Sequence, residues 1–172
     1  GEIHAVTVPG GRKQPDTVVE EDEFPRPDTQ IEKLAALRTL NPSGVTTAAN
    51  ASGLNDGAVA MVVASQSAGE SVGETPLVRI LSSGVAGVPP RIMGYGPVPA
   101  AEIALKRAGL TMADMDVIEI NEAFAAQVLA CLKGMGIAFD DSRVNPNGGA
   151  ITVGHPLGAS GPRIALTAAR QL

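Results

Sequence analysis

Short apolar runs alternate with Ala-rich segments along this chain, and this alternation constrains its fold more than any other feature. Strands are predicted at residues 2–8, 45–49, 58–65, 77–86, 117–120 and 144–145. Helices are predicted at residues 29–38, 100–108 and 122–133, and from 162 to the end. Strands that alternate with helices favour α/β layers. Aromatic residues make up only 2% and Trp is absent, so the core must be built from aliphatic side chains.

Local signals refine these boundaries. Thr29 and Glu32 form a T-x-x-E pattern, which predicts a capping box at the start of the first helix. Gly109 predicts the end of the helix at 100–108. The polar segment 12–27 predicts an extended surface excursion. Residues 58–65 predict a fully buried strand, and 66–76 a surface connection.

Composition argues against several classes of function. The formal net charge is −5 and no basic stripe is present, so nucleic acid is an unexpected partner. No apolar run reaches the length of a membrane span, and no signal peptide opens the chain, which favours the cytoplasm. No Cys/His cluster has metal-ligand spacing, so we expect no metal. The chain starts at Gly1 and ends inside a predicted helix, which predicts a fragment of a longer protein.

The single cysteine has the context of a structural residue. Cys131 lies in the middle of a predicted helix, within the apolar stretch Val-Leu-Ala-Cys-Leu. Buried cysteines of this kind are usually inert, so we do not expect Cys131 to act as a nucleophile. One cysteine excludes an intrachain disulfide among these residues and fits a reducing compartment.

Two stretches have residues suited to chemistry. Asn121 and Glu122 follow a predicted strand, at the strand end where α/β proteins bind ligands. The alternative is structural, with Asn121 capping the next helix. His155 lies between Gly154 and Pro156, ahead of a Gly-rich helix start. An imidazole suits proton transfer near neutral pH, although a lone histidine is often structural.

Four motifs together resemble the thiolase family. Asn-Glu-Ala-Phe at 121–124 and Gly-His-Pro-Leu-Gly-Ala-Ser-Gly at 154–161 are similar to two thiolase signatures. Residues 50–57 and 93–97 resemble further parts of that family, in the same order. The resemblance implies a layered α-β-α-β-α fold, of which this chain holds only the later part. It assigns 1–44 to the end of the loop domain, 45–75 to the close of the N-terminal half, and 76–172 to most of the C-terminal half.

The resemblance also implies an activity and a set of site residues. Thiolases condense two acyl-CoA molecules, or cleave a 3-oxoacyl-CoA with CoA, and need no cofactor besides this thioester substrate. His155 would activate the nucleophilic cysteine and help hold a thioester oxyanion, while Asn121 would position a water in the same oxyanion hole. Glu122 and Gly154 would support them. The contacts to CoA or the acyl group would be Arg26, Ser52, Met93, Ala123 and Phe124. Family members are usually homo-dimers or homo-tetramers.

The chain departs from the family pattern in its cysteines. Neither the nucleophilic cysteine nor the second cysteine of a C-x-G-G-G stretch is among these residues. Without a thiolate no covalent acyl-enzyme forms, so we expect the chain alone to be inactive. A non-catalytic CoA-binding or assembly module on a thiolase-like scaffold is the alternative, and a third possibility is an unrelated α/β protein. Within the family, segments 143–149 and 90–93 favour the oxoadipyl or general degradative type.

Overall fold

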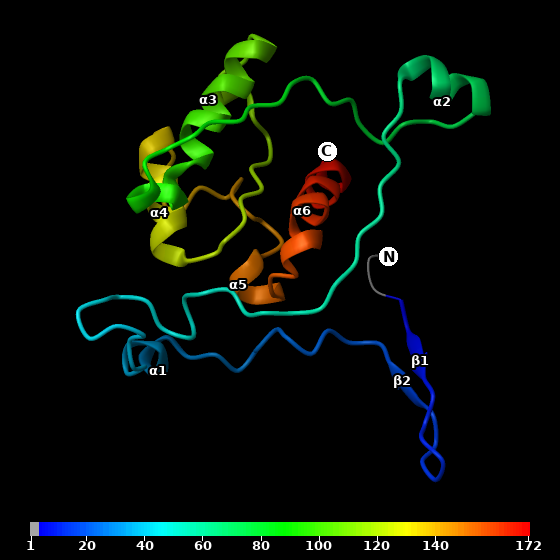
Figure 1. The fold of residues 1–172 in the computed structure, drawn as a ribbon, viewed down its shortest axis with the longest axis vertical. Helices are drawn as coiled ribbons and strands as arrows, with labels where there is room; N and C mark the ends of the chain where they lie inside the picture. The colour runs from blue at the N-terminus through cyan, green and yellow to red at the C-terminus, as the bar shows by residue number, and fades with distance from the viewer. Residues whose placement is uncertain (1–3) are drawn as a thin grey trace.

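The computed structural model describes residues 4–172 and combines a small hairpin with a body of helices and loops (Figure 1). The strands are β1 (Val6–Val8) and β2 (Thr17–Val19). The helices are α1 (Ile31–Ala35), α2 (Gln66–Val72), η1 (Pro90–Tyr95), α3 (Pro97–Ala108), η2 (Met112–Asp114), α4 (Ala125–Met135), α5 (Ala150–Val153) and α6 (Leu157–Gln171). No helix within the described residues is long and apolar enough to cross a membrane.

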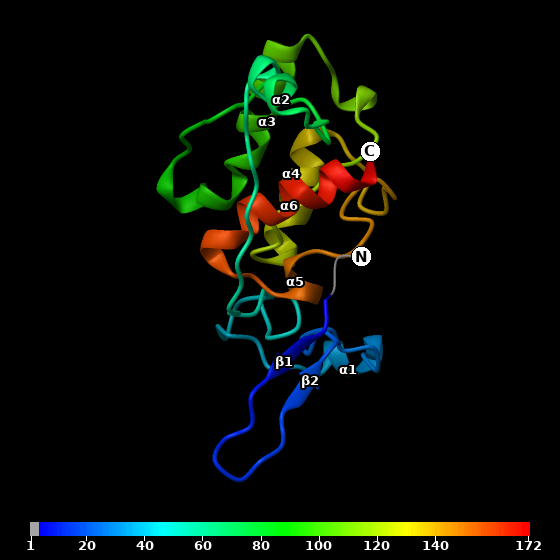
Figure 2. The same ribbon diagram turned by 90° about the vertical axis from the view of Figure 1, so that its right-hand side faces the viewer.

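The hairpin projects away from the helical body (Figure 2). Its two strands pair antiparallel, with Val6 opposite Val19 and Val8 opposite Thr17. The Asp16 carboxylate accepts a hydrogen bond from the Gly10 amide at 2.9 Å, which closes the connecting loop. The predicted extended surface excursion at 12–27 is confirmed, because nearly all of it is exposed, and it also contains β2, which was not predicted. Of the strand predicted at 2–8, residues 2 and 3 lie outside the described part.

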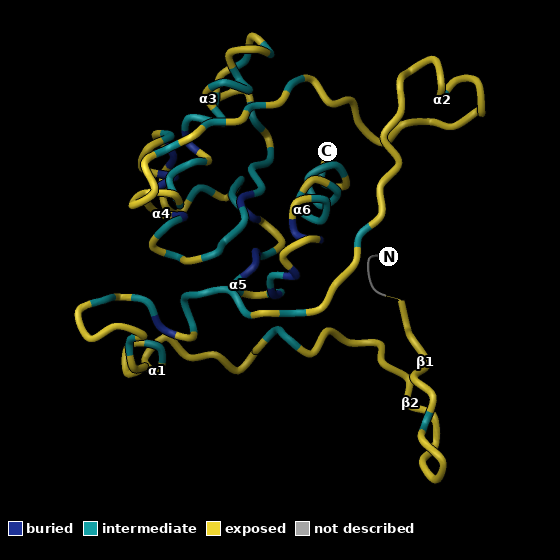
Figure 3. The backbone as a smooth tube through the Cα atoms, in the orientation of Figure 1, coloured by how far each residue is buried: buried dark blue, intermediate teal, exposed yellow. Residues whose placement is uncertain are grey.

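A small apolar core lies between α3, α4 and the segment that leads into Asn121. Its buried members are Val98, Ile120, Val128, Cys131, Leu132 and Ile137. Figure 3 shows buried backbone on α4 and again around α5 and the start of α6. Cys131 is fully buried, burial raises the pKa of its thiol, and the thiol donates to the Gly94 carbonyl at 3.2 Å. This environment agrees with a structural cysteine.

Most of the predicted strands do not form ladders. Segments 58–64 and 77–88 are extended, but no backbone–backbone hydrogen bond ties them to another part of the described chain. The prediction of a fully buried strand at 58–65 is wrong, because Val62 is 97% exposed. Residues 45–49 and 117–120 make only isolated bridges, Thr39 with Thr47 and Ile118 with Val144. An extended segment becomes a strand only beside a partner that takes its N–H and C=O groups.

Two predicted helix starts are wrong because the polar side chains bond elsewhere. The Thr29 hydroxyl donates to the Arg26 carbonyl at 2.7 Å, and α1 begins after Gln30 without a side-chain cap. Asn121 caps no helix, because α4 begins only at Ala125, with Phe124 at its N-cap. The helix expected from 162 begins five residues earlier, at Leu157. The connection at 66–76 contains α2, which Ser65 caps by accepting from the Ala68 amide.

The predicted end of the helix at 100–108 is confirmed. Gly109 takes a left-handed conformation with φ of 70° at the C-cap of α3. The helix predicted at 122–133 ends in the same way, because Met135 is the last residue of α4 and Gly136 is its C-cap. Glycine populates this region without the steric cost that a Cβ brings, so these residues end both core helices.

Truncation of a core side chain tests this packing. Leu132 is 2% exposed, so Leu132→Ala is expected to lower the free energy of unfolding by about 2–5 kcal/mol. Leu129 lies on the same helix but is 42% exposed, so Leu129→Ala should cost less than about 1 kcal/mol. Urea denaturation followed by circular dichroism measures both. Equal losses for the two variants would contradict the assigned core.

Candidate active site

Three loops that are far apart in the sequence meet around His155. Leu54 and His155 form a parallel bridge, and Ala51 and Phe124 an antiparallel one. The His155 amide donates to the Gly53 carbonyl at 3.0 Å and lies 3.3 Å from the Asn55 side-chain oxygen. These contacts bring the motifs at 50–57, 121–124 and 154–161 to one place.

The two residues predicted to be catalytic have side chains in contact. The Nε2 atom of His155 lies 3.4 Å from the Asn121 amide nitrogen, across 34 residues of sequence. Its other ring nitrogen, Nδ1, lies 2.6 Å from the Ser160 hydroxyl. His155 and Asn121 are half-buried, whereas Ser160 is almost fully buried. Each ring nitrogen of His155 therefore lies next to a polar side chain, Nε2 next to Asn121 and Nδ1 next to Ser160 on α6.

The side-chain oxygen of Asn121 is buried and has no hydrogen-bond partner within residues 4–172. Buried polar atoms are nearly always satisfied, and leaving one unpaired costs roughly 1–3 kcal/mol. An unpaired acceptor next to an imidazole is suited to hold a water molecule or a donor group of a ligand. This position lies beside the ring nitrogen that faces Asn121.

Glu122 joins the Asn121 loop to the loop before His155. One carboxylate oxygen accepts from the Asn145 amide at 2.9 Å, and the other accepts from the Ile151 backbone at 3.0 Å. Asn145 in turn pairs with both backbone groups of Ile120, at 2.8 and 2.9 Å. Glu122, which was predicted to be a supporting residue, thus bridges two loops through its carboxylate. Sequence analysis did not predict this hydrogen-bond network.

Two glycines are required where these loops approach each other. A Cβ on Gly149 would clash with the Glu122 carboxylate. A Cβ on Gly154 would clash with the Asn55 side chain, and Gly154 has a φ of 82° and a ψ of 170°. That combination of angles is essentially confined to glycine. The Gly154 carbonyl also accepts from the Arg163 guanidinium at 2.7 Å, so α6 holds the residue before His155.

The remaining predicted residues divide into two groups. The backbone amide and the hydroxyl of Ser52 lie 3.1 and 3.3 Å from the Ala123 carbonyl, so both residues belong to the meeting loops. Phe124 follows directly and is 45% exposed. Met93 and Arg26 are exposed, and no hydrogen bond joins either to His155 or Asn121 in the part of the chain described. The structure does not bring these two into the cluster.

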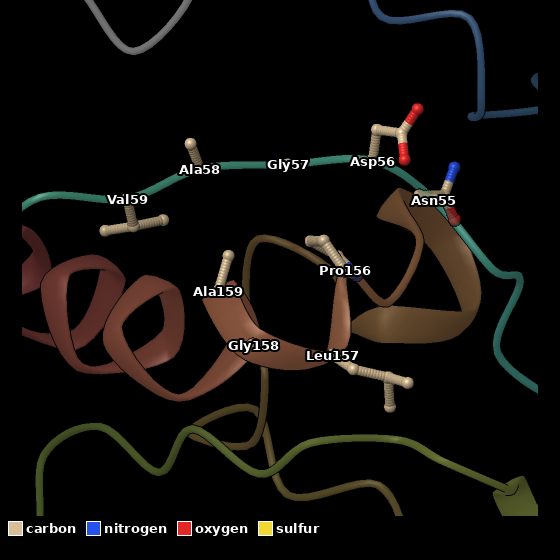
Figure 4. Close-up of a pocket in the computed structure, with 9 residues that line it drawn as sticks. All are labelled: Asn55, Asp56, Gly57, Ala58, Val59, Pro156, Leu157, Gly158 and Ala159. Carbon is tan, nitrogen blue, oxygen red and sulfur yellow. The ribbon is translucent and has the colours of Figure 1, made fainter.

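An open hollow of about 350 Å³ flanks the cluster. Residues 55–59 run along one side of it, and 156–159 at the start of α6 line the other, as Figure 4 shows. His155 and Asn121 do not line this hollow. Among the described residues, no group of three His, Cys, Asp or Glu side chains could hold a metal ion.

Asn145 and Ser160 are the polar contacts that sequence reasoning missed. Asn145 has a positive φ of 43°, which Asn tolerates better than most residues, and it precedes a Pro-Asn-Gly-Gly turn. That context could have indicated a structural asparagine. Ser160 lies five residues after His155. No periodicity rule connects a loop residue with a helical residue at that spacing, so only the fold brings them together.

Substitution of Gly154 tests the strained loop. Gly154→Ala is expected to cost at least about 1–3 kcal/mol, because alanine must adopt a glycine conformation and also displace Asn55. Gly158 is the matched control, since a Cβ there meets nothing and the residue is helical. Gly158→Ala should be neutral or stabilising by about 0.5–1 kcal/mol. Thermal unfolding measures the stability of both variants. A Gly154→Ala variant as stable as the unsubstituted chain would contradict the loop geometry.

Comparison with known proteins agrees with this arrangement of motifs. Residues 1–67 match the family described as "Thiolase, N-terminal domain", and residues 74–172 match "Thiolase, C-terminal domain". The chain is 56% identical over 172 residues to a beta-ketoadipyl-CoA thiolase of Pseudomonas aeruginosa, covering 99% of this chain and 42% of that protein. It is 53% identical over 157 residues to the 3-oxoadipyl-CoA/3-oxo-5,6-dehydrosuberyl-CoA thiolase of Escherichia coli, covering 91% of this chain and 39% of that protein.

Solved structures agree as well. Human mitochondrial 3-ketoacyl-CoA thiolase superposes with a TM-score of 0.89 at 45% identity, over 98% of this chain and 41% of that one. The acetyl-CoA acetyltransferase of Bacillus anthracis superposes with a TM-score of 0.86 at 42% identity, over 98% and 41% of the two chains. The chain thus spans about 42% of the length of the curated relatives that it matches. The expected α/β thiolase fold is confirmed, and by its motifs, its fold and its relatives this chain belongs to the thiolase family.

Proposed function

We propose that this chain contributes the histidine and asparagine of a thiolase active site, within a protein that exchanges acyl groups between coenzyme A thioesters. One observation carries the proposal, which is the contact of His155 Nε2 with the Asn121 side chain at 3.4 Å beside a buried, unpaired Asn121 oxygen. An imidazole beside a fixed amide suits both proton transfer and binding of a polarised carbonyl.

The reaction assigns a step to each side chain. In the cleavage direction, a cysteine thiolate adds to the 3-oxo carbonyl of the substrate and the C2–C3 bond breaks. The acyl group stays on the cysteine, and the released enolate takes a proton to give acetyl-CoA. The sulfur of a CoA molecule then adds to the acyl-cysteine and the cysteine thiolate leaves, which gives the shortened acyl-CoA. His155 would accept the thiol proton and then donate to the thioester oxygen, while Asn121 would hold a water at that oxygen. Donors aimed in this way contribute roughly 3–4 kcal/mol each to transition-state stabilisation.

Neither cysteine required for this chemistry is among the 172 residues. The only cysteine, Cys131, is fully buried in the core with its thiol on the Gly94 carbonyl. We therefore propose that the 172 residues alone do not turn over, and that a protein carrying them together with a nucleophilic cysteine does. Exposed apolar segments at 58–64 and 77–85 support an arrangement in which further chain covers them.

The substrate proposal follows the relatives. Several relatives at 52–56% identity are named beta-ketoadipyl-CoA thiolases, so 3-oxoadipyl-CoA is the first substrate to test. The predicted contacts to the CoA or acyl group remain Arg26, Ser52, Met93, Ala123 and Phe124. Ser52, Ala123 and Phe124 are supported by their place in the meeting loops. Arg26 and Met93 rest on the resemblance alone, although Phe24, two residues before Arg26, packs its ring against Gly53.

The remaining parts of the proposal concern the whole protein. We infer a cytoplasmic homo-dimer or homo-tetramer that uses acyl-CoA and CoA and needs no other cofactor. We propose the division into 1–44, 45–75 and 76–172; the gap between the two family matches, residues 68–73, lies near the second of these boundaries. A CoA-binding or assembly module without catalysis is the competing function, favoured by the missing cysteines.

Turnover assays separate these functions. In a protein that carries this chain with the family's cysteines, His155→Ala should lower kcat/KM for CoA-dependent cleavage of 3-oxoadipyl-CoA by about 10²- to 10³-fold, as loss of a fixed oxyanion donor does. Asn121→Ala should give a similar loss. His4→Ala is the matched control, because His4 is exposed beside the hairpin and should leave turnover unchanged.

Three results would count against the proposal. Clear turnover by the 172 residues alone would show that the missing cysteines are dispensable. An unchanged rate for His155→Ala would remove the imidazole from the mechanism. Binding of CoA by calorimetry without any cleavage, in a protein that has both cysteines, would support the non-catalytic module.

A further inference from the structure

Ser160 is a buried polar residue for which the reaction described above has no use. It lies in the first turns of α6 and is 2% exposed. Its hydroxyl lies 2.6 Å from His155 Nδ1 and 3.2 Å from the Pro156 carbonyl. A hydroxyl donates one hydrogen bond and accepts others, so its two neighbours cannot both receive its proton.

The direction of these hydrogen bonds follows from their partners. The Pro156 carbonyl can only accept, so the Ser160 hydroxyl donates to it. The hydroxyl oxygen then accepts from His155, which requires a proton on Nδ1. A neutral imidazole has one N–H, so Nε2 is unprotonated and accepts from the Asn121 amide nitrogen, 3.4 Å away.

Both ends of the ring thus indicate the same tautomer. The opposite tautomer would need the Ser160 hydroxyl turned away from Pro156 and the Asn121 amide turned over. The backbone around the ring is fixed independently, since the His155 amide is held by the Gly53 carbonyl and the Gly154 carbonyl by Arg163. The ring therefore has a fixed position, and Ser160 decides which nitrogen holds the proton.

We propose that Ser160 is a positioning residue that keeps neutral His155 protonated on Nδ1, so that Nε2 is the nitrogen that exchanges protons in the active site. This inference rests on the proposed function for its catalytic meaning. The tautomer itself is a property of the chain and can be measured without any turnover.

Nitrogen-15 NMR of the histidine side chains tests the proposal directly. The chain has only two histidines, and exposed His4 gives an internal reference for a solvated ring. At about pH 9, where an ordinary imidazole is neutral, the Nδ1 signal of His155 should be that of a protonated nitrogen and the Nε2 signal that of an unprotonated one. An Nε2–H tautomer in the unsubstituted chain would overturn the proposal.

Two variants remove the hydrogen bond in different ways. Ser160→Ala deletes the hydroxyl, and Ser160→Cys keeps the approximate volume but offers only a weak acceptor and donor. In both, the His155 tautomer should shift toward that of His4, while the backbone amide spectrum stays dispersed. If Ser160→Ala disturbs the fold, the cysteine variant decides. An unchanged tautomer in a folded variant would contradict the proposal.

Kinetics form a separate arm of the test. In a protein that carries this chain and cleaves 3-oxoacyl-CoA, Ser160→Ala should lower kcat by about 10- to 100-fold, as loss of a histidine-orienting partner does at metal sites. KM should change little, because Ser160 would touch no substrate. An unchanged kcat would overturn the catalytic part. If the Nδ1–H tautomer is present but the protein does not cleave the thioester, only the proposed function is refuted.

Discussion

The buried amide of Asn145 is the interaction on which the site depends. Its oxygen accepts from the Ile120 amide, and its nitrogen donates both to the Ile120 carbonyl and to Glu122. All of its main hydrogen-bonding capacity is used inside the protein, where an unpaired group would be costly. This side chain extends the backbone pairing in which Ile118 bonds to Arg143 and Asn145. It fixes the end of the segment from which Asn121 projects, relative to the loop that leads to His155.

The same network joins the loops of the site, although the sheet formed by the described residues has only the strands β1 and β2. Glu122 extends the network to the Ile151 amide, and Gly149 leaves room for its carboxylate. The loop at 50–55 then joins through Ser52 and Asn55. Each link is a hydrogen bond between loops that are far apart in the sequence. Segments 58–64 and 77–88 take no part in these links, so the cluster does not depend on the backbone–backbone hydrogen bonds that they lack within the described residues.

Prediction from the sequence succeeded where the signal is local and failed where it depends on a partner. Gly109 ends α3 because glycine adopts the left-handed C-cap conformation without contacts to distant parts of the chain. Ala58–Ser65 has the composition of a buried strand, but burial needs covering layers, and Val62 is exposed. Asn121 has the chemistry of a helix cap, yet its amide faces His155. The motifs placed His155 and Asn121 in one site, whereas the contact of Ser160 with His155 could be identified only from the fold.

Position and protonation of the histidine are controlled by different parts of the chain. Gly154, with its glycine-only backbone angles, and the Gly53 carbonyl set where the ring lies. Ser160, on the following helix, sets which nitrogen holds the proton. Because α6 supplies both Ser160 and Arg163, one rigid element contacts the loop on either side of the ring. A base for a thiol must be aimed and must also have its lone pair facing the reacting proton. A short motif that runs from loop into helix can meet both requirements, since the loop aims the ring and the helix orients its proton.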